Sequence, residues 1–165
     1  MVVMLQLAAL AIAAAQAAPT KEAPGLPTKR FLPLEVAKAA ANAAVGQCAA
    51  NGFSISVAVL DRSGGMIVYL RGDNAKPHHA GSARRKAYTA LTFQMLSSQV
   101  AAFVASHPAA AGLLSMDGVI ALGGGMPIKV GGDVVGAIGV AGGAKNGDDE
   151  PCAQAGIDAI AQFLR

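Results

Sequence analysis

A run of short apolar segments separated by glycine, residues 118–143, constrains the fold of this chain most strongly. It reads GVIALGGGMPIKVGGDVVGAIGVAGG and holds half of the chain's 20 glycines. Gly131-Gly132 forms a two-residue break of the kind that closes a β-hairpin, because glycine adopts positive φ without steric cost. The block therefore predicts antiparallel strands. Three of its segments are rich in strand-favouring residues: 119–122, 127–130 and 134–140.

The same glycines do not have the arrangement of a phosphate-binding loop. Such a loop needs a strand, then glycines, then the N-terminus of a helix. In this block the glycines separate one strand from the next. We therefore exclude a dinucleotide-binding or P-loop site.

Hydrophobic periodicity and turn residues define the remaining elements. Helices and strands do not alternate regularly along the chain, which predicts an α+β fold with about five strands. The other expected elements are a helix from Leu34 to Asn51-Gly52, strands at 53–60 and 66–71, a polar loop at 72–79, a helix from about Ser82, a short helix after Ser97-Ser98 and a last helix after Asp148-Asp149.

Three groups of polar residues are expected to start particular elements. Asp61 is expected to begin the turn between the first two strands by binding nearby backbone N–H groups. Ser97-Ser98 is expected to cap the short helix. Asp148 and Asp149 are expected to cap the last helix, whose N-terminus favours negative charge.

The first 17 residues are expected to form a signal peptide. The first 18 residues carry no charge, and the apolar stretch 5–15 is too short to span a bilayer. Ala15-Gln16-Ala17 has the small-x-small form of a cleavage site. A buried N-terminal helix is the alternative, although the Pro-rich linker 18–30 would separate it from the domain at 31–165. Export to the periplasm or outside the cell follows from this interpretation.

The composition excludes some classes of protein. Hydrophobic residues make up 53% of the chain and charged residues 14%, which excludes disorder. A surface this poor in charge favours subunit contacts, so a homo-oligomer is expected. The net charge of +3, without clustered aromatic residues, does not indicate a nucleic-acid partner.

The chain has two cysteines, Cys48 and Cys152. In an oxidising compartment such a pair is expected to form one disulfide. Two buried thiols that pack as small hydrophobic groups are the alternative. The expected export favours the disulfide.

Most of the reactive side chains fall in residues 70–90, LRGDNAKPHHAGSARRKAYTA. On spacing alone, the Arg-Arg-Lys run is expected to be a solvated basic helix face. Arg84 and Tyr88 lie four residues apart and share one helical face. Neither a nucleophile elbow nor a pair of carboxylates in an apolar context occurs, so no catalytic residue is assigned and an enzyme is not indicated.

Three segments together resemble the GlcG/HbpS family, and the resemblance covers residues 31–165. They are RGDNAKPHHAGSARRKAYTA, SVAVLDRSGGMIVYLR, and GGGMPIKVGGDVVGAIGVAGG followed by DDEPCAQAGIDAI. The resemblance implies an oligomer and a profilin-like α+β fold, with a central antiparallel sheet of about five strands flanked by helices. Some members are exported and bind haem, and one branch serves a redox-sensing system, which implies a membrane sensor partner. A related domain is fused to PduO-type corrinoid adenosyltransferases and binds haem.

A haem site needs an axial ligand, an apolar slot and cations for the propionates. If the family resemblance extends to haem, His78 is the best candidate for the iron ligand, and His79 is the second. Tyr88 is a weaker alternative ligand. The cations that could pair with the propionates are Lys76, Arg84 and Arg85.

Two other functions remain open on the sequence. The chain could be a binding protein or enzyme for a hydroxy acid or a corrinoid, since Arg84 and Arg85 could hold any carboxylate. It could also be an assembly module whose charge-poor sheet serves oligomerisation.

Overall fold

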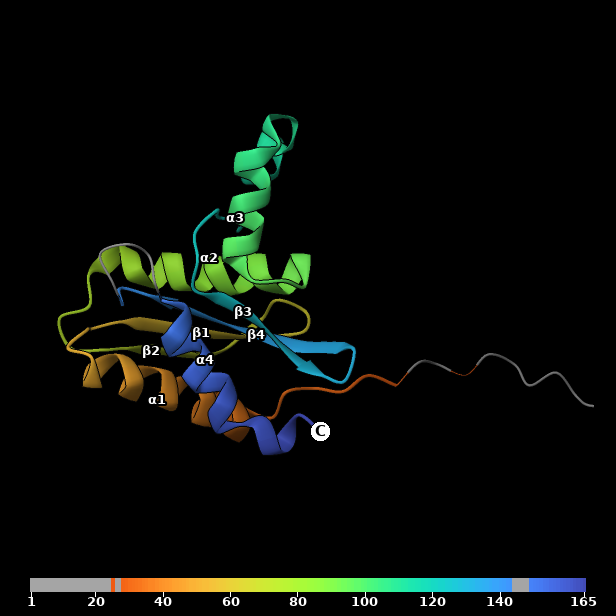
Figure 1. Ribbon diagram of the computed structural model, residues 1–165. Helices are drawn as coiled ribbons and strands as arrows, with labels where there is room; N and C mark the ends of the chain where they lie inside the picture. Colours follow the sequence, from red (N-terminus) through yellow and green to blue (C-terminus); the bar gives the residue numbers. More distant parts are fainter. Residues whose placement is uncertain (1–24, 26–27, 144–148) are drawn as a thin grey trace, which may run out of the picture.

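The computed structural model describes residue 25, residues 28–143 and residues 149–165. The expected signal peptide at 1–17, most of the linker at 18–30 and the expected cap Asp148 lie outside these residues. Four antiparallel strands form one sheet in the order β2-β1-β4-β3 (Figure 1). The strands are β1 (Ser56–Asp61), β2 (Met66–Arg71), β3 (Gly125–Val130) and β4 (Asp133–Ala141).

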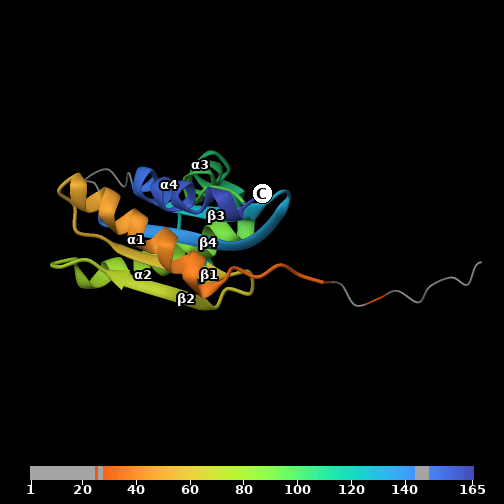
Figure 2. The ribbon, with the colours of Figure 1, turned by 90° about the horizontal axis from the view of Figure 1, so that it is seen from below.

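Helices cover both faces of this sheet, which confirms the α+β class. Helices α1 and α4 pack together on one face, and α2 covers the other (Figures 1 and 2). Helix α3 and the 3-10 helix η1 project away from the sheet beyond α2 (Figure 1). The helices are α1 (Leu34–Ala50), α2 (Pro77–Phe93), α3 (Ser97–Ser106), η1 (Pro108–Ser115), α4 (Glu150–Ala159) and η2 (Ala161–Phe163). None of the described helices is both long enough and apolar enough to cross a membrane.

The two faces of the sheet carry side chains of different size. Val57 and Val59 of β1 belong to the main core that α1 and α4 cover. On the opposite face, small residues such as Ala58 and Ala137 pack against α2. This alternation follows from the two-residue period of a strand. Because its side of the sheet bears small side chains, α2 lies close to the strands.

Glycines of the 118–143 block make this close approach of α2 sterically accessible. A Cβ at Gly139 would overlap the carbonyl oxygen of Ala83, and a Cβ at Gly125 would overlap that of Lys86. Both carbonyls belong to α2, so its backbone rests directly on β4 and on the start of β3. The glycine-rich block therefore positions this helix.

Several local expectations are confirmed. Gly131-Gly132 closes the β3–β4 hairpin, and Gly131 has a φ of 59°. Helix α1 ends before Asn51-Gly52, and strand β2 has the expected bounds. Asp61 begins the β1–β2 turn, because its Oδ1 accepts hydrogen bonds from the backbone N–H groups of Ser63 and Gly65 at 2.7 and 3.0 Å.

The expected fifth strand, residues 119–122, is wrong, and the sheet has four strands. The backbone groups of this segment bind side chains of two helices instead of a neighbouring strand. Thr89 Oγ1 accepts from the N–H of Ile120 at 2.9 Å, and Ser97 Oγ donates to the carbonyl of Leu122 at 2.7 Å. With these groups satisfied by side chains, the segment does not need a strand partner.

The expected starts of two helices also require correction. Helix α2 begins at Pro77 rather than near Ser82, so residues 77–79 are its first turn and do not belong to a polar loop. The fixed φ of proline and its missing N–H suit the first helical position. Ser97 does not cap α3, because Leu96 takes the cap position and the Ser97 hydroxyl accepts from the N–H of Gly125 at 2.8 Å.

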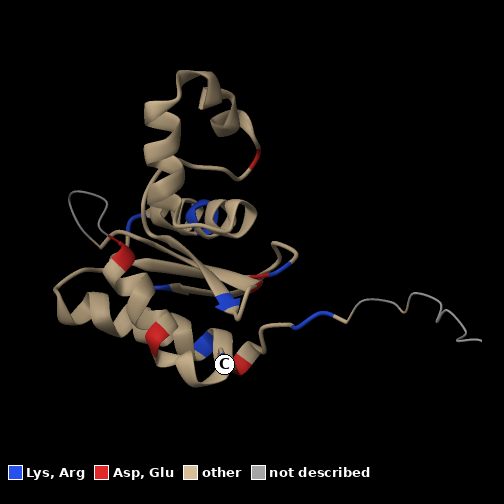
Figure 3. Cartoon of the chain, turned by 45° about the vertical axis from the view of Figure 1, so that its right-hand side comes forward, with Lys and Arg blue, Asp and Glu red and all other residues tan. Residues whose placement is uncertain are grey.

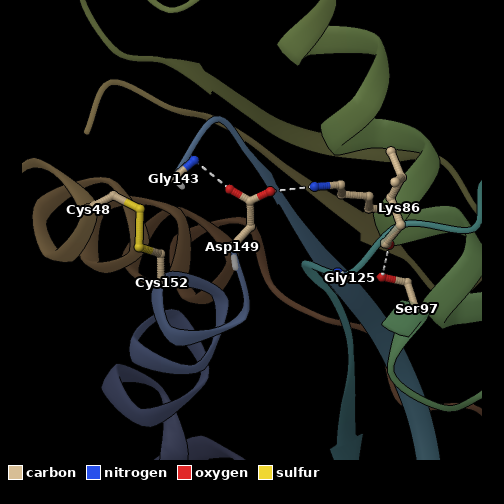
Figure 4. A network of polar contacts seen from close by, with 8 residues as sticks. Cys48, Lys86, Ser97, Gly125, Gly143, Asp149 and Cys152 are labelled. Carbon is tan, nitrogen blue, oxygen red and sulfur yellow. Dashed lines mark hydrogen bonds and ion pairs between the residues drawn. A yellow bond between two sulfur atoms is a disulfide. The ribbon is translucent and has the colours of Figure 1, made fainter. Parts of the chain in front are cut away.

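The cysteines form the expected disulfide. Cys48 of α1 and Cys152 of α4 are bonded, and their Cα atoms lie 5.6 Å apart. Asp149 takes the cap position of α4, but its carboxylate does not cap the helix. It binds Lys86 of α2 and the backbone N–H of Gly143 instead (Figure 4).

Candidate ligand-binding site on helix α2

The outer face of α2 gathers most of the candidate site residues. Ala83, Ala87 and Ala90 are fully buried against the sheet. A helix turns 100° per residue, so positions 78, 81, 84, 85 and 88 fall on the opposite side. His78, Arg84 and Arg85 are exposed there, and Tyr88 is half-buried. At a rise of about 1.5 Å per residue, the span from position 78 to position 88 is roughly 15 Å.

Gly81 leaves a gap in the middle of this face. It is exposed, and no described heavy atom lies within 4 Å of the place where a Cβ would be. His78 lies one turn before it and Arg84 one turn after it. The face therefore has an uncrowded position between an imidazole and a guanidinium, where a ligand could approach the helix backbone.

The two histidines have different surroundings. His78 is exposed, whereas the ring of His79 is half-buried against Gly142, where a Cβ would overlap its Nδ1 atom. The two rings lie nearly perpendicular, with centroids 4.6 Å apart. Lys76 precedes them as the exposed N-cap residue of α2. Of these two neighbouring residues, His78 is the more exposed.

The environment of His79 favours its neutral form. Burial lowers the pKa of this imidazole below 6.5, and the neighbouring His78 lowers it further, while Asp149 opposes the shift. Its Nδ1 atom is buried and has no hydrogen-bond partner among the described residues. Neutral imidazole is the form that ligates a metal.

The Arg84-Arg85-Lys86 run does not form a uniform solvated face. Arg84 borders a hollow of about 180 Å³ that Tyr88, Asp117 and Gly118 also line. The Arg85 guanidinium donates to the carbonyl of Val119, which partly satisfies it. Lys86 is only 4% exposed and forms an ion pair with Asp149. The expectation of a solvated face is correct for two of the three residues.

Tyr88 is held at the edge of this face by two glycines. A Cβ at Gly118 would lie 2.9 Å from its Cδ1 atom, and a Cβ at Gly64 would lie 3.3 Å from its Cε2 atom. The ring is thus wedged between the β1–β2 turn and the segment after η1. This packing fixes the aromatic ring beside Arg84.

In a single copy of the protein, the outer face of α2 is exposed to solvent. The hollow of about 180 Å³ is smaller than the roughly 300–1,000 Å³ of pockets that enclose a drug-sized ligand. Lys and Arg residues mark α2 and the segment before α1 (Figure 3). Among the described residues, no group of three or more His, Cys, Asp or Glu side chains is placed to hold a metal ion. The face therefore offers one imidazole and nearby cations rather than a complete set of metal ligands.

Sequence reasoning missed Gly81, the pair Asp117-Gly118 and the buried partners of α2. An isolated glycine within a helical pattern is a signal for a packing or functional role, so Gly81 could have been found. The burial of Lys86 has no such signal, because its partner Asp149 is 63 positions away.

By its fold the chain is an α+β protein with helices on both faces of a four-stranded antiparallel sheet. It belongs to the HbpS-like family: the family model described as "Haem degrading protein HbpS-like" matches residues 32–158. A comparison with curated protein sequences finds no match.

Solved structures agree with this family. The chain is 42% identical to a double mutant of HbpS from Streptomyces reticuli, with a TM-score of 0.76, covering 87% of this chain and 97% of that one. It is 26% identical to the protein in a PduOC–haem complex, with a TM-score of 0.71, covering 79% and 95%. ORFY of Klebsiella pneumoniae shares the fold at 22% identity and a TM-score of 0.77, covering 85% and 98%.

Proposed function

We propose that this chain is an exported haem-binding protein of the HbpS type, which senses or sequesters haem. The observation that carries the proposal is the exposed face of α2, where His78 and Arg84 lie on either side of Gly81. The similarity to the PduOC–haem complex and to HbpS supports haem as the ligand.

Each candidate residue has a role in this proposal. His78 is the axial ligand, since its imidazole is exposed one helical turn before Gly81. His79 is the second candidate and would bind only through a change of its packing against Gly142. Tyr88 is a weaker alternative. Bound haem would supply iron for redox or ligand-binding chemistry. The propionates would pair with the cations Lys76, Arg84 and Arg85. The Arg85 guanidinium would keep its hydrogen bond to the Val119 carbonyl while binding a propionate.

We also propose a homo-oligomer with a profilin-like subunit. Ligand sites bury most of the ligand surface, and one chain leaves the outer face of α2 open. Large apolar side chains are exposed on and around the projecting α3–η1 arm, namely Met95, Phe103, Leu114 and Met116. A second copy could cover both surfaces.

Export rests on the sequence and on the cysteines. Residues 1–17 would be removed as the signal peptide, residues 18–30 would serve as a linker, and the domain would occupy 31–165. The Cys48–Cys152 disulfide supports an oxidising compartment. A membrane sensor is the proposed protein partner, by analogy with the branch of the family that serves redox sensing.

A small hydroxy acid is the second candidate ligand. The hollow bordered by Arg84, Tyr88, Asp117 and Gly118 has the size of a small molecule and presents one guanidinium. Calorimetric titration with glycolate tests this alternative. If glycolate binding gives a saturable heat signal and the Arg84→Gln variant loses that signal, a hydroxy acid is favoured over haem as the ligand.

Titration of the purified, haem-free protein with haemin tests the main proposal. We expect a saturable Soret band at a defined stoichiometry, and light scattering of the same sample should give a mass above that of one chain. An absorbance spectrum that remains the sum of free haemin and protein would overturn haem binding. Fusion of residues 1–30 to a reporter that is active only after export tests the signal peptide separately.

A further inference from the structure

We propose that the chain has a second ligand site, for an amphipathic organic anion such as a medium-chain carboxylate. The site is a cavity of about 520 Å³ on the side of the sheet that α1 and α4 cover, away from α2. The segment before α1, the end of the β3–β4 hairpin and the C-terminal residues meet there (Figure 2). Its volume is within the range of small-molecule pockets, roughly 300–1,000 Å³.

The floor of the cavity is the edge of the main hydrophobic core. Leu32, Val36 and Val135 are almost fully buried, and all three line the cavity. Leu32 reaches over Gly136, where a Cβ would lie 3.2 Å from its Cδ2 atom. The floor is therefore apolar and held in place by the sheet.

Two exposed phenylalanines form part of the wall. Phe31 is 69% exposed and Phe163 is 55% exposed, although both line the cavity. Large aromatic side chains usually bury most of their surface. The alkyl chain of a ligand bound here would cover apolar surface of both rings that the protein alone leaves exposed to water.

The charged side chains of the lining both belong to arginines. Arg30 and Arg165 border the cavity, and neither forms an ion pair with any described residue. The backbone at Arg30 is held by Arg62, whose Nη1 donates to the Arg30 carbonyl at 3.1 Å. A hollow next to the cavity adds Lys29, with Asp133 as its acidic residue. Cationic side chains therefore outnumber acidic ones around an apolar floor.

This combination selects one chemical class of ligand. A neutral hydrocarbon would use the floor but leave the arginines without a partner. Inorganic phosphate would use the arginines but leave the apolar walls in water. An alkyl chain that ends in a carboxylate uses both, and arginine binds a carboxylate through two parallel hydrogen bonds.

A tryptophan reporter gives a direct test, because the chain contains no tryptophan. Phe163→Trp places a single indole at the cavity in the haem-free full chain. We expect decanoate, below its micelle-forming concentration, to shift the indole emission to shorter wavelength in a saturable way. Calorimetry of the unmodified chain with decanoate should give the same affinity.

Variants without the two arginines, and a neutral ligand of the same chain length, test the role of charge. Arg30→Gln with Arg165→Gln, in the Phe163→Trp background, should weaken decanoate binding by about tenfold or more, and decanol should bind similarly weakly. Lys38→Gln, an exposed change on α1 outside the cavity, should leave the affinity unchanged. Equal affinity for decanoate and decanol, or no saturable change, would overturn the proposal. If the indole emission wavelength changes with protein concentration but not with decanoate, the proposal is overturned, and a second copy of the protein covers this surface instead.

Discussion

Lys86 of α2 and Asp149 at the start of α4 form an ion pair in which both side chains are almost fully buried, 4% and 3% exposed. The same carboxylate accepts a hydrogen bond from the N–H of Gly143, next to the end of β4 (Figure 4). Cys152, one turn further along α4, is bonded to α1. The helix that carries the candidate haem site is thus linked to the opposite layer of the fold through one ion pair.

Removal of one partner of this pair should destabilise the protein strongly. Lys86→Met leaves the Asp149 carboxylate buried without its cation, so we expect the free energy of unfolding to fall by about 3–5 kcal/mol. Urea denaturation followed by circular dichroism measures this change. The double variant Lys86→Met with Asp149→Leu should lose less than the single variant, because no uncompensated charge remains.

The exposed pair Glu35–Lys38 on α1 provides the matched control. Its atoms lie 3.1 Å apart, but the side chains are 78% and 50% exposed. Lys38→Met should therefore change the free energy of unfolding by about 0–1 kcal/mol. Equal losses for Lys86→Met and Lys38→Met would show that the buried pair does not link the layers.

Gly139→Ala should destabilise the contact between α2 and the sheet. The added Cβ would overlap backbone atoms of Ala83 and Ala87, neither of which can move without shifting the helix. We expect a loss of about 1–3 kcal/mol, as for other overpacking changes, measured by thermal or urea denaturation. Gly132→Ala is the control, since no described atom lies within 4 Å of its Cβ position. A neutral Gly139→Ala would contradict the close approach of α2.

Reduction of the disulfide should lower the melting temperature. The bond joins residues separated by 104 positions, and a loop of this length corresponds to roughly 4–5 kcal/mol of lost unfolded-state entropy. Differential scanning calorimetry with and without a thiol reductant measures the effect. The double variant Cys48→Ala with Cys152→Ala should melt at the temperature of the reduced protein, both with and without the reductant. A reductant effect of the same size in that double variant would contradict this assignment.

His79 should titrate below the usual range of a histidine. Burial lowers its pKa below 6.5 in the folded protein, so the unfolded chain binds a proton more readily there. The contribution of His79 to stability is present above pH 6.5 and is lost as the pH falls through its folded-state pKa. NMR titration of the imidazole protons should give His79 a midpoint below 6.5, and His79→Gln should flatten this part of the stability profile. A midpoint at or above 6.5 would contradict the half-buried position of the ring.

Local sequence patterns predicted the parts of the fold that depend on nearby residues. The hairpin at Gly131-Gly132, the end of α1 and the turn at Asp61 follow from the conformational preferences of glycine and aspartate. The disulfide followed from the number of cysteines and the expected compartment. Pro77 also carried the signal for the start of α2, but the polar residues before Ser82 obscured it.

The remaining features depend on residues far apart in the sequence. Residues 119–122 have strand propensity, yet Thr89 and Ser97 satisfy their backbone from helices 25 to 31 positions away. The burial of Lys86 depends in the same way on Asp149. For the candidate site, the sequence indicated the helix and the residue types, whereas the packing of Tyr88 between Gly64 and Gly118 required the packed structure.

The most direct test of the proposed function compares haem binding by His78→Ala and His107→Ala. Both imidazoles are exposed, but His107 ends α3 on the projecting arm, away from the outer face of α2. We expect His78→Ala to weaken haemin binding by about tenfold or more and to shift the Soret band, and His107→Ala to leave both unchanged. Haem binding that is the same in the two variants would contradict the assignment of His78 as the iron ligand on α2.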